Sequence, residues 1–432
     1  MIRTMVGEGM RVEISNLAKI KKLNAKVDGI TVIAGENNTG KSTVGKVLFA
    51  LFNSTVDLQK RVMNYRKNRI FTILRKGVED ILSSSEDGYF NRIHANRRRM
   101  DTIASTLLEQ NMYKHDKEKI HSLVSGFYET IGLFNECNKA YEKVKDITEQ
   151  IVQVFEVEDE KVYNLLVEKY FSGTFNGQIN NIYFNDKEAT VDLIIHDTQH
   201  LKIKILNNKC EIEKMDFKTM HDAVYIDSPF SVDKLNRYMY YDNNYIEAML
   251  IEKLTKEKET NLIEEIVVSN KIEEIMKKLN DVFEGQIVKD ENDGFVVQYQ
   301  NKKLDIKNLS TGLKAFSILK MLLERGVIKE KDVLVLDEPE IHLHPQWQLV
   351  YAEIIVLLQK YFDLSIVITT HSPYFLDAIE TFSAQHGIKD KVNYYLSECH
   401  EDGAEFHDVS DNLELVYQKL AKPLDILDSI RY

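Results

Sequence analysis

Eight consecutive residues near the N-terminus have the types and spacing that binding of a nucleotide phosphate requires: Gly35, Glu36, Asn37, Asn38, Thr39, Gly40, Lys41 and Ser42. Glycines at both ends let backbone N–H groups curl around phosphate oxygens, because a residue with a Cβ approaches them less closely. We expect Lys41 to reach the β- and γ-phosphates of ATP and the Ser42 hydroxyl to coordinate Mg²⁺. The predicted nucleotide-binding set in this stretch is Gly35, Asn37, Asn38, Thr39, Gly40, Lys41, Ser42 and Thr43.

The residues on either side of this loop have the periods that a phosphate-binding loop needs. Residues 30–34 are apolar, which predicts a buried strand leading into the loop. After it, apolar residues recur at helical spacing at Val44, Val47, Leu48 and Leu51. A helix should therefore begin beside the phosphates, where its N-terminus adds partial positive charge. A glycine-containing turn that matches the motif by chance would not predict these flanks.

Two further apolar strands are predicted in the C-terminal third, and each ends on polar residues suited to hydrolysis. Residues 333–336 deliver Asp337 and Glu338, and residues 364–370 deliver His371. Ligands of open α/β sheets bind at such strand ends. Asp337 is suited to hold Mg²⁺ through water, and Glu338 to orient and partly deprotonate the attacking water. A lone histidine would favour a structural role, but after an apolar strand His371 is expected to donate a hydrogen bond to the γ-phosphate.

These roles define two sets of predicted site residues. The predicted catalytic residues are Glu338, Lys41 and His371. The predicted metal ligands are Ser42 and Asp337.

A second anion site is predicted at LSTGLK, residues 309–314, which opens a helical pattern running to Glu324. Ser310 stands where a helix N-cap belongs, with Gly312 in the first turn, and Gly326 is a plausible C-cap. The free amides of such a helix end bind anions. An ordinary cap would be the simpler interpretation if this motif stood alone.

Length and composition bound the class of protein. A chain of 432 residues exceeds the usual size of one core, so two or more structural units are expected. Hydrophobic residues make up 44% and charged residues 29%, as in ordinary soluble globular proteins. No apolar run suits a signal peptide or a membrane span. Cys137, Cys210 and Cys399 are far apart, which argues against disulfides or structural zinc. These observations predict a cytoplasmic protein with no membrane partner.

The hydrophobic period divides the chain into segments. Residues 58–170 predict long helices, and residues 178–215 predict an antiparallel meander of about four strands. Polar turns are expected in that meander at residues 185–187, 196–199 and 207–209. A buried strand at 223–226, a helical block at 235–283 and a hairpin at 285–300 follow. The predicted divisions are an ATPase head at 1–58, a helical arm at 59–177, the meander at 178–234, a second helical insertion at 235–284 and the rest of the head at 285–432.

Charge is unevenly placed along the chain. Residues 59–99 hold eleven Lys and Arg and four acids, a net charge of +7 within a chain of net charge −12. This basic arm, from Lys60 to Arg99, predicts an anionic partner such as nucleic acid. A solvated helix face is the simpler explanation for most of these charges.

Four motifs together resemble those of ABC-type ATPases: GENNTGKS, LSTGLK, VLVLDEPEIHLHP and ITTHSP. They are similar to the Walker A, signature, Walker B and switch-histidine motifs of the branch containing SMC, Rad50, RecF and the OLD nucleases. The residues around Walker B resemble those of OLD-like bacterial ATPases, many of which belong to anti-phage systems such as Septu, PARIS and retron-linked modules. The resemblance implies an α/β fold: an ABC-type ATPase head, with a P-loop and a mixed sheet with helices, that carries a β meander and helical-arm insertions.

The resemblance also implies a partner. Two copies of the chain would dimerise, or form a higher oligomer, around ATP and Mg²⁺. The P-loop of one copy would then face Ser310 and Gly312 of the other. The physical argument agrees, because the signature helix end needs a γ-phosphate from outside its own pocket.

The sequence departs from that family in informative ways. The helical arm has no CxxC hook, and Gln59 is the nearest candidate for a Q-loop. After His371 about sixty residues remain, without a second acidic constellation of the nuclease kind. His342 and His344 could bind metal as an HxH pair, but no third ligand is apparent, and shaping a loop at the dimer interface is the simpler role.

The leading functional hypothesis is an ATPase that senses a signal and regulates a separately encoded effector, a nuclease or toxin, in anti-phage defence. The alternative is a RecF- or Rad50-like repair or recombination ATPase acting directly on DNA. A third hypothesis is the nucleotide-binding subunit of a transporter. The helical insertion and the EIHLHP segment argue against it. The sequence names neither the trigger nor the effector, and it leaves the stoichiometry open.

Overall fold

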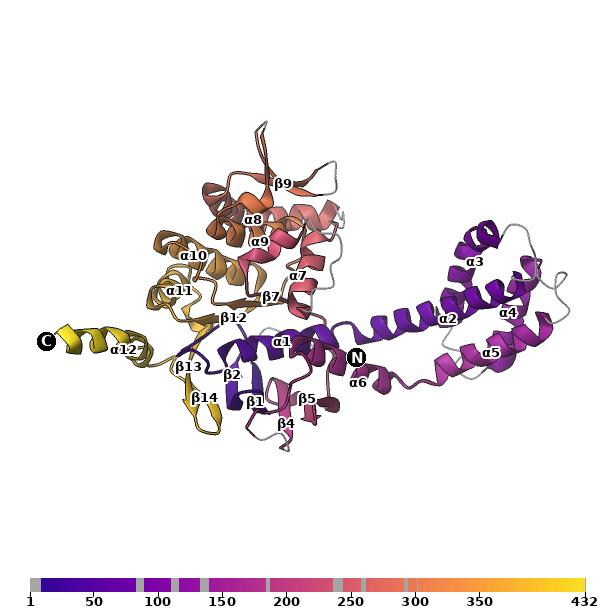
Figure 1. Cartoon of the computed structure of the whole chain (residues 1–432), viewed down its shortest axis with the longest axis horizontal. Coiled ribbons are helices and arrows are strands. Elements are labelled where there is room, and N and C mark those ends of the chain that lie inside the picture. Colours follow the sequence, from indigo (N-terminus) through magenta and orange to yellow (C-terminus); the bar gives the residue numbers. More distant parts are fainter. Residues whose placement is uncertain are drawn as a thin grey trace. The chain divides into compact units, whose positions relative to one another are not determined.

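The computed structural model describes residues 9–82, 89–109, 116–132, 140–183, 187–235, 244–257, 262–290, 294–300 and 302–431. Contacts divide the chain into two compact units (Figure 1). The head combines Met1–Val56 with Leu166–Tyr432, and the helical unit is Asp57–Leu165. Among the described helices, none has both the length and the apolarity to cross a bilayer.

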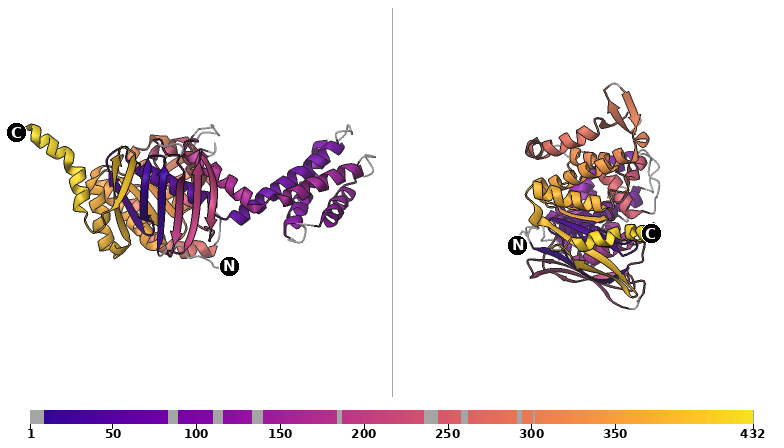
Figure 2. Two further views of the ribbon diagram at one scale, coloured as in Figure 1. Left: turned by 90° about the horizontal axis from the view of Figure 1, so that it is seen from below. Right: turned by 90° about the vertical axis from the view of Figure 1, so that its left-hand side faces the viewer.

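An 11-stranded mixed sheet runs through the head, and its strands face the viewer in the left view of Figure 2. Its order is β6-β5-β4-β1-β2-β14-β13-β3-β12-β11-β7. Five neighbours in it, β13, β3, β12, β11 and β7, run parallel. The strands are β1 (Met10–Leu17), β2 (Ile20–Lys26), β3 (Ile30–Gly35), β4 (Ala189–Ile195), β5 (Gln199–Leu206), β6 (Lys209–Met215), β7 (Ala223–Ile226), β11 (Val333–Asp337), β12 (Ser365–Thr370), β13 (Val392–His400) and β14 (Gly403–Asp408).

Four of the parallel strands, β3, β7, β11 and β12, are buried almost throughout because both of their faces are covered. Alternate residues of β11 belong to different cores: Leu334 and Leu336 share one with residues of α9, α10 and α11, whereas Val333 and Val335 share the other with residues of α1. The helices of the head are α1 (Lys41–Thr55), α7 (Tyr245–Thr255), α8 (Leu262–Val282), α9 (Thr311–Glu324), α10 (Pro345–Phe362), α11 (Pro373–Gln385) and α12 (Glu414–Arg431). The carboxyl ends of the parallel strands therefore lie on the same side of the sheet as the N-termini of α1 and α11.

The helical unit has its own core, separate from those of the head. Apolar residues of α2, α3, α4 and α5 form it, including Leu74, Met100, Val124 and Ile151. Its helices are α2 (Leu58–Leu82), α3 (Tyr89–Glu109), α4 (Lys117–Thr130), α5 (Ala140–Glu156) and the first part of α6 (Asp159–Thr174), which continues into the head.

Three segments differ from the sequence-based expectation. Among the described residues the meander has three strands, β4 to β6, because residues 178–183 and 187–188 contribute one isolated bridge, Leu17 to Asn180. The hairpin at 285–300 gains a third strand: β8 (Gln286–Lys289), β9 (Phe295–Tyr299) and β10 (Lys302–Asp305). The 235–283 block contains α7 and α8. The predicted turn at 185–187, parts of that block and Cys137 lie outside the described residues. The predicted division points at 58, 177, 234 and 284 remain predictions.

Candidate nucleotide-binding site

The predicted phosphate-binding loop joins β3 to α1, as the flanking periods indicated. Two glycines are required by its geometry. A Cβ on Gly35 would lie 2.2 Å from Ser397 Oγ, and Gly40 begins α1 with φ +81°. The loop is held from the neighbouring strand β13, because the Thr39 and Ser397 hydroxyl oxygens are 2.6 Å apart. No side chain caps α1, so amides of its first turn are left for another acceptor.

Lys41 is enclosed by this loop and is only 4% exposed. Its Nζ donates hydrogen bonds to the carbonyl oxygens of Gly35 (3.1 Å) and Glu36 (2.7 Å). Burial lowers the Lys41 pKa to about 8, and the charges of Glu338 and Asp337 oppose that shift. Burial disfavours the charged form of the ammonium group, and a bound anion would favour that form again.

Asp337, at the end of β11, is the centre of a hydrogen-bond cluster from three other elements. Its Oδ1 accepts hydrogen bonds from the hydroxyls of Ser42 (2.9 Å) and Thr369 (2.5 Å), and its Oδ2 accepts one from Tyr225 (2.7 Å). Burial and the Asp337 charge raise the Tyr225 pKa well above its usual value, so this phenol stays a donor. A hydroxyl beside a carboxylate is an oxygen donor set that fits Mg²⁺. Ser42 and Asp337 would hold the ion, whose chemistry is to neutralise charge on phosphate oxygens.

Glu338 and His371 meet at the ends of adjacent strands. The His371 Nε2 lies 2.8 Å from Glu338 Oε1. Glu338 has φ +51°, a left-handed conformation that is uncommon outside glycine, and its backbone N–H donates to Thr369. Burial and the Lys41 charge lower the His371 pKa, while Glu338 raises it. The structure thus brings Ser42 of the loop to Asp337 at the end of β11, and Glu338 to His371, which follows β12.

Glu340 is a residue whose place in the site the sequence analysis missed. It is 4% exposed, and its Oε1 accepts hydrogen bonds from the Thr370 hydroxyl (2.5 Å) and the His371 backbone N–H (3.0 Å). Burial raises the pKa of this carboxyl. Glu340 fixes the His371 backbone to the loop after β11, so the two carboxylates Glu338 and Glu340 position the histidine from both sides.

The end of β7 also contributes to the site, which the sequence analysis did not anticipate. A cavity of about 150 Å³ is lined by Ser42, Asp337 and Glu338 together with Asp227, Ser228 and His342. Burial raises the pKa of Asp227. The signal in the sequence was the short apolar strand ending in Asp-Ser-Pro. Gln59, the predicted Q-loop candidate, lies in α2 of the helical unit, and its role remains a prediction.

The signature motif begins α9, as predicted, and the chain turns at Gly326 with φ +63°. Ser310 is an exposed N-cap whose side chain makes no capping hydrogen bond. Packing within the chain explains why residue 312 is a glycine, since a Cβ there would lie 2.6 Å from carbons of the Trp347 ring. Lys314 is buried and its Nζ lies 2.7 Å from Asp233 Oδ1. The predicted contacts of Ser310 and Gly312 with ATP remain predictions.

The histidines of the EIHLHP segment have partners within the chain. The His342 ring packs edge-on against Phe230, with ring centroids 5.5 Å apart. His344 is the N-cap of α10, and its Nδ1 accepts a hydrogen bond from the Gln346 backbone N–H (3.4 Å). Within the described residues, neither histidine belongs to a group of metal-binding side chains. Both contacts fit the loop-shaping role.

Residues 10–376 match the family described as the AAA ATPase domain, and the chain belongs to this family. It is a nucleotide-binding ATPase with a mixed α/β head, as the motifs predicted.

One relative is the endonuclease GajA of Bacillus cereus (strain HuB5-5), which is 22% identical over 422 residues. The match covers 86% of this chain and 56% of GajA, so the chain spans little more than half of that relative's length. The family and this relative support the resemblance to SMC-, Rad50- and OLD-type ATPases.

Among solved structures, the chain is similar to an SMC head bound to the C-winged helix domain of ScpA, at 11% identity and a TM-score of 0.41. That match covers 94% of this chain and 98% of the other. The SMC head domain from Thermotoga maritima also matches at 11% identity, with a TM-score of 0.39 and coverage of 92% and 98%.

Proposed function

We propose that the chain hydrolyses ATP with Glu338 as the base, and that its nucleotide state is a switch that controls a separately encoded effector. The observation that carries the catalytic part is the pairing of Ser42 with Asp337 beside the pairing of Glu338 with His371. The first pair would hold Mg²⁺ against the β- and γ-phosphates. Glu338 then accepts a proton from the attacking water while His371, 2.8 Å away, holds the carboxylate in place. Lys41 would exchange its two carbonyl partners for phosphate oxygens.

The switch would work through a dimer of two copies around ATP. Large apolar side chains are exposed on the loops and helices that adjoin the site: Ile341 (60%), Tyr374 (73%), Leu349 (45%) and Phe230 (45%). Large apolar residues exposed beside a site are candidates for an interaction surface. A second copy that supplied Ser310 and the α9 N-terminus to the γ-phosphate would cover them. ATP then favours the dimer through differential affinity, and hydrolysis releases it.

The second half of the proposal concerns what ATP hydrolysis regulates. The relative GajA carries an endonuclease name, but this chain matches only 56% of its length. We propose that this chain turns over ATP without cutting nucleic acid and that it holds an effector nuclease or toxin, in anti-phage defence, in check or in readiness. The protein would act in the cytoplasm.

Purified protein tests this proposal through two assays. It should hydrolyse ATP in a Mg²⁺-dependent way and leave DNA and RNA intact. An effector encoded beside this gene should bind the ATP-trapped Glu338→Gln protein and the nucleotide-free protein with different affinities, because a ligand shifts an equilibrium only through differential binding. Cleavage of DNA or RNA that persists in Glu338→Gln protein and is lost on changing residues outside the ATP site would overturn the regulator proposal.

A second candidate function is direct contact with nucleic acid through the helical unit, in the manner of a RecF- or Rad50-like ATPase. It is favoured by Arg97, Arg98 and Arg99, which are exposed side by side on α3. Changing all three to Glu should abolish DNA or RNA binding, and parent binding should fall steeply with salt. Lys360→Glu with Lys389→Glu, at exposed lysines of the head, is the control. A parent protein with no affinity for either nucleic acid at low salt removes this candidate.

A further inference from the structure

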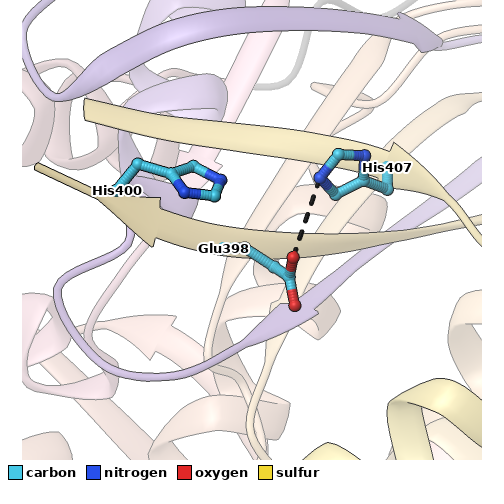
Figure 3. Close-up of side chains that lie close together, drawn as sticks. All are labelled: Glu398, His400 and His407. Atoms are coloured by element: carbon cyan, nitrogen blue, oxygen red, sulfur yellow. Dashed lines mark ion pairs between the residues drawn. The ribbon is translucent and has the colours of Figure 1, made fainter. Parts of the chain in front are cut away.

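The hairpin of β13 and β14 gathers two histidines and a carboxylate that the sequence analysis did not connect. Glu398 and His400 are two residues apart on β13, so they share one face of the strand. His407 lies on β14, opposite Leu396 of β13. Figure 3 shows the two imidazole rings pointing toward one another, with the Glu398 carboxylate beside them. In the described part of the chain, this group of His, Cys, Asp and Glu side chains has the spacing of a metal site.

The distances suit a metal ion with little rearrangement. One ligand atom from each of the three side chains lies within 4.8 Å of the others, and His407 Nε2 is 3.8 Å from Glu398 Oε2. Ligand atoms of a tetrahedral zinc site are about 3.4 Å apart, given bonds of about 2.1 Å. Both histidines are exposed, so small rotations of their side chains close the difference at low cost.

The surroundings of the cluster also favour a cation. Glu405 stands directly opposite Glu398 across the hairpin, and like charges in that arrangement are unfavourable. Lys21 pairs with Glu405 (2.8 Å). Lys419 approaches the other oxygen of Glu398, Oε1, at 3.5 Å. Glu398 Oε2 therefore faces the histidines while Lys419 orients the carboxylate from behind, which is the role that an outer partner has in metal centres.

We propose that Glu398, His400 and His407 bind a divalent transition-metal ion such as Zn²⁺. Two imidazoles and one carboxylate select this class over Mg²⁺ or Ca²⁺, which prefer oxygen ligands. With three protein ligands on an exposed hairpin, water completes the coordination. The ion would tie the two strands of the hairpin together.

The hairpin lies next to the phosphate-binding loop. Ser397, the residue before Glu398, pairs in register with Gly35 and contacts Thr39. Lys419 also lies 3.6 Å from Glu36 of the loop. A metal ion at Glu398 would therefore stabilise the strand that supports the loop, and its binding should be visible in the thermal stability of the whole head.

The test uses the full chain without a polyhistidine tag, freed of metal by chelation and titrated with Zn²⁺ by calorimetry. Excess Mg²⁺ is present, so that the oxygen-ligand site near Ser42 does not compete for zinc. The parent should bind one Zn²⁺ per chain, and its melting temperature should rise with zinc. His400→Asn and His407→Asn should each weaken binding by more than the roughly 10–100-fold that loss of an outer-shell partner costs.

His196→Asn is the matched control, because His196 is an exposed histidine at the β4–β5 turn with φ +50°, a conformation that Asn accepts. It should bind zinc as the parent does. Circular dichroism and ATP binding confirm folding, and Glu398→Gln provides a third variant should one histidine change impair it. Co²⁺ bound in place of zinc should give an absorption spectrum that both histidine changes alter. A parent that binds no Zn²⁺, or histidine variants that bind it as tightly as the parent, would overturn the proposal.

Discussion

Two helices of the head, α1 and α9, begin at motifs expected to face ATP phosphates, and their N-termini have different surroundings. Neither helix has a side-chain cap, so both leave amides for an anion. At α1 the anion site is complete within the chain, because Lys41 is enclosed there and Ser42 already touches Asp337. At α9 the cation of the first turn, Lys314, is paired with Asp233, and Ser310 is exposed.

The difference shows that two helices with uncapped N-termini need not have the same role. The α1 end combines amides, a buried ammonium and a carboxylate-bound hydroxyl, a set of groups that suits phosphate and a metal ion. The α9 end offers amides and a hydroxyl alone. Our account is that α1 binds the nucleotide of its own chain and that α9 completes a site only when a second copy brings a γ-phosphate to it.

The largest expected effect concerns hydrolysis at the α1 end. Glu338→Gln keeps the shape of the side chain but removes the base, so the rate of ATP hydrolysis should fall by roughly 10²–10⁴-fold. Binding of ATP should be retained. In Lys41→Ala, by contrast, binding itself should weaken, because the ammonium contacts the nucleotide in the ground state. Phosphate release and fluorescent-nucleotide titration separate the two variants. Hydrolysis at the parent rate in Glu338→Gln would show that another group is the base.

A smaller effect is expected from pH. Burial holds the Lys41 pKa near 8 in the nucleotide-free site, so Lys41 is charged below pH 8 and loses its proton above it. Phosphate favours the charged form, and ATP affinity should therefore be highest below pH 8 and fall above it by at most about tenfold per pH unit. Lys41→Arg, which stays charged, is the control. An affinity in the parent that is flat above pH 8 would contradict the enclosed-lysine argument.

The smallest expected effect separates packing from nucleotide contact at the α9 end. In Gly312→Ala the new methyl would press on the Trp347 ring, and the free energy of unfolding should drop by about 1–3 kcal/mol. Trp347→Phe in the same chain should recover part of that loss by making room. Urea unfolding measures both changes. A Gly312→Ala protein as stable as the parent would mean that the ring moves away at no cost.

The sequence alone identified site residues where they are neighbours within one short motif. Gly35 to Ser42 and the Asp337-Glu338 pair were identified because short motifs follow strands with clear periods, and the structure brings them together. Tyr225 and Asp227 were missed because their relation to Asp337 depends on β7 pairing with β11 across more than a hundred residues of chain. Nothing local indicates that pairing. Glu340 was quoted in a motif without a role, since its partners Thr370 and His371 lie on another strand.

The same limit explains the hairpin cluster. His400 and His407 come together because β13 pairs with β14, and no sequence motif indicates that pairing. One strand too many was predicted for the meander, because the described residues before β4 alternate like a strand but form one isolated bridge in place of a ladder.

The most direct test of the account is the molar mass of the chain in solution with a non-hydrolysable ATP analogue and Mg²⁺, measured by light scattering. The parent should double its mass when the analogue binds. Ser310→Arg should bind the analogue with parent affinity yet remain a monomer, because the arginine blocks the α9 end. Asn412→Arg, at an exposed position just before α12, should dimerise like the parent. A Ser310→Arg protein that dimerises normally, or a parent whose mass does not change, would contradict the model in which α9 completes the site of a second copy.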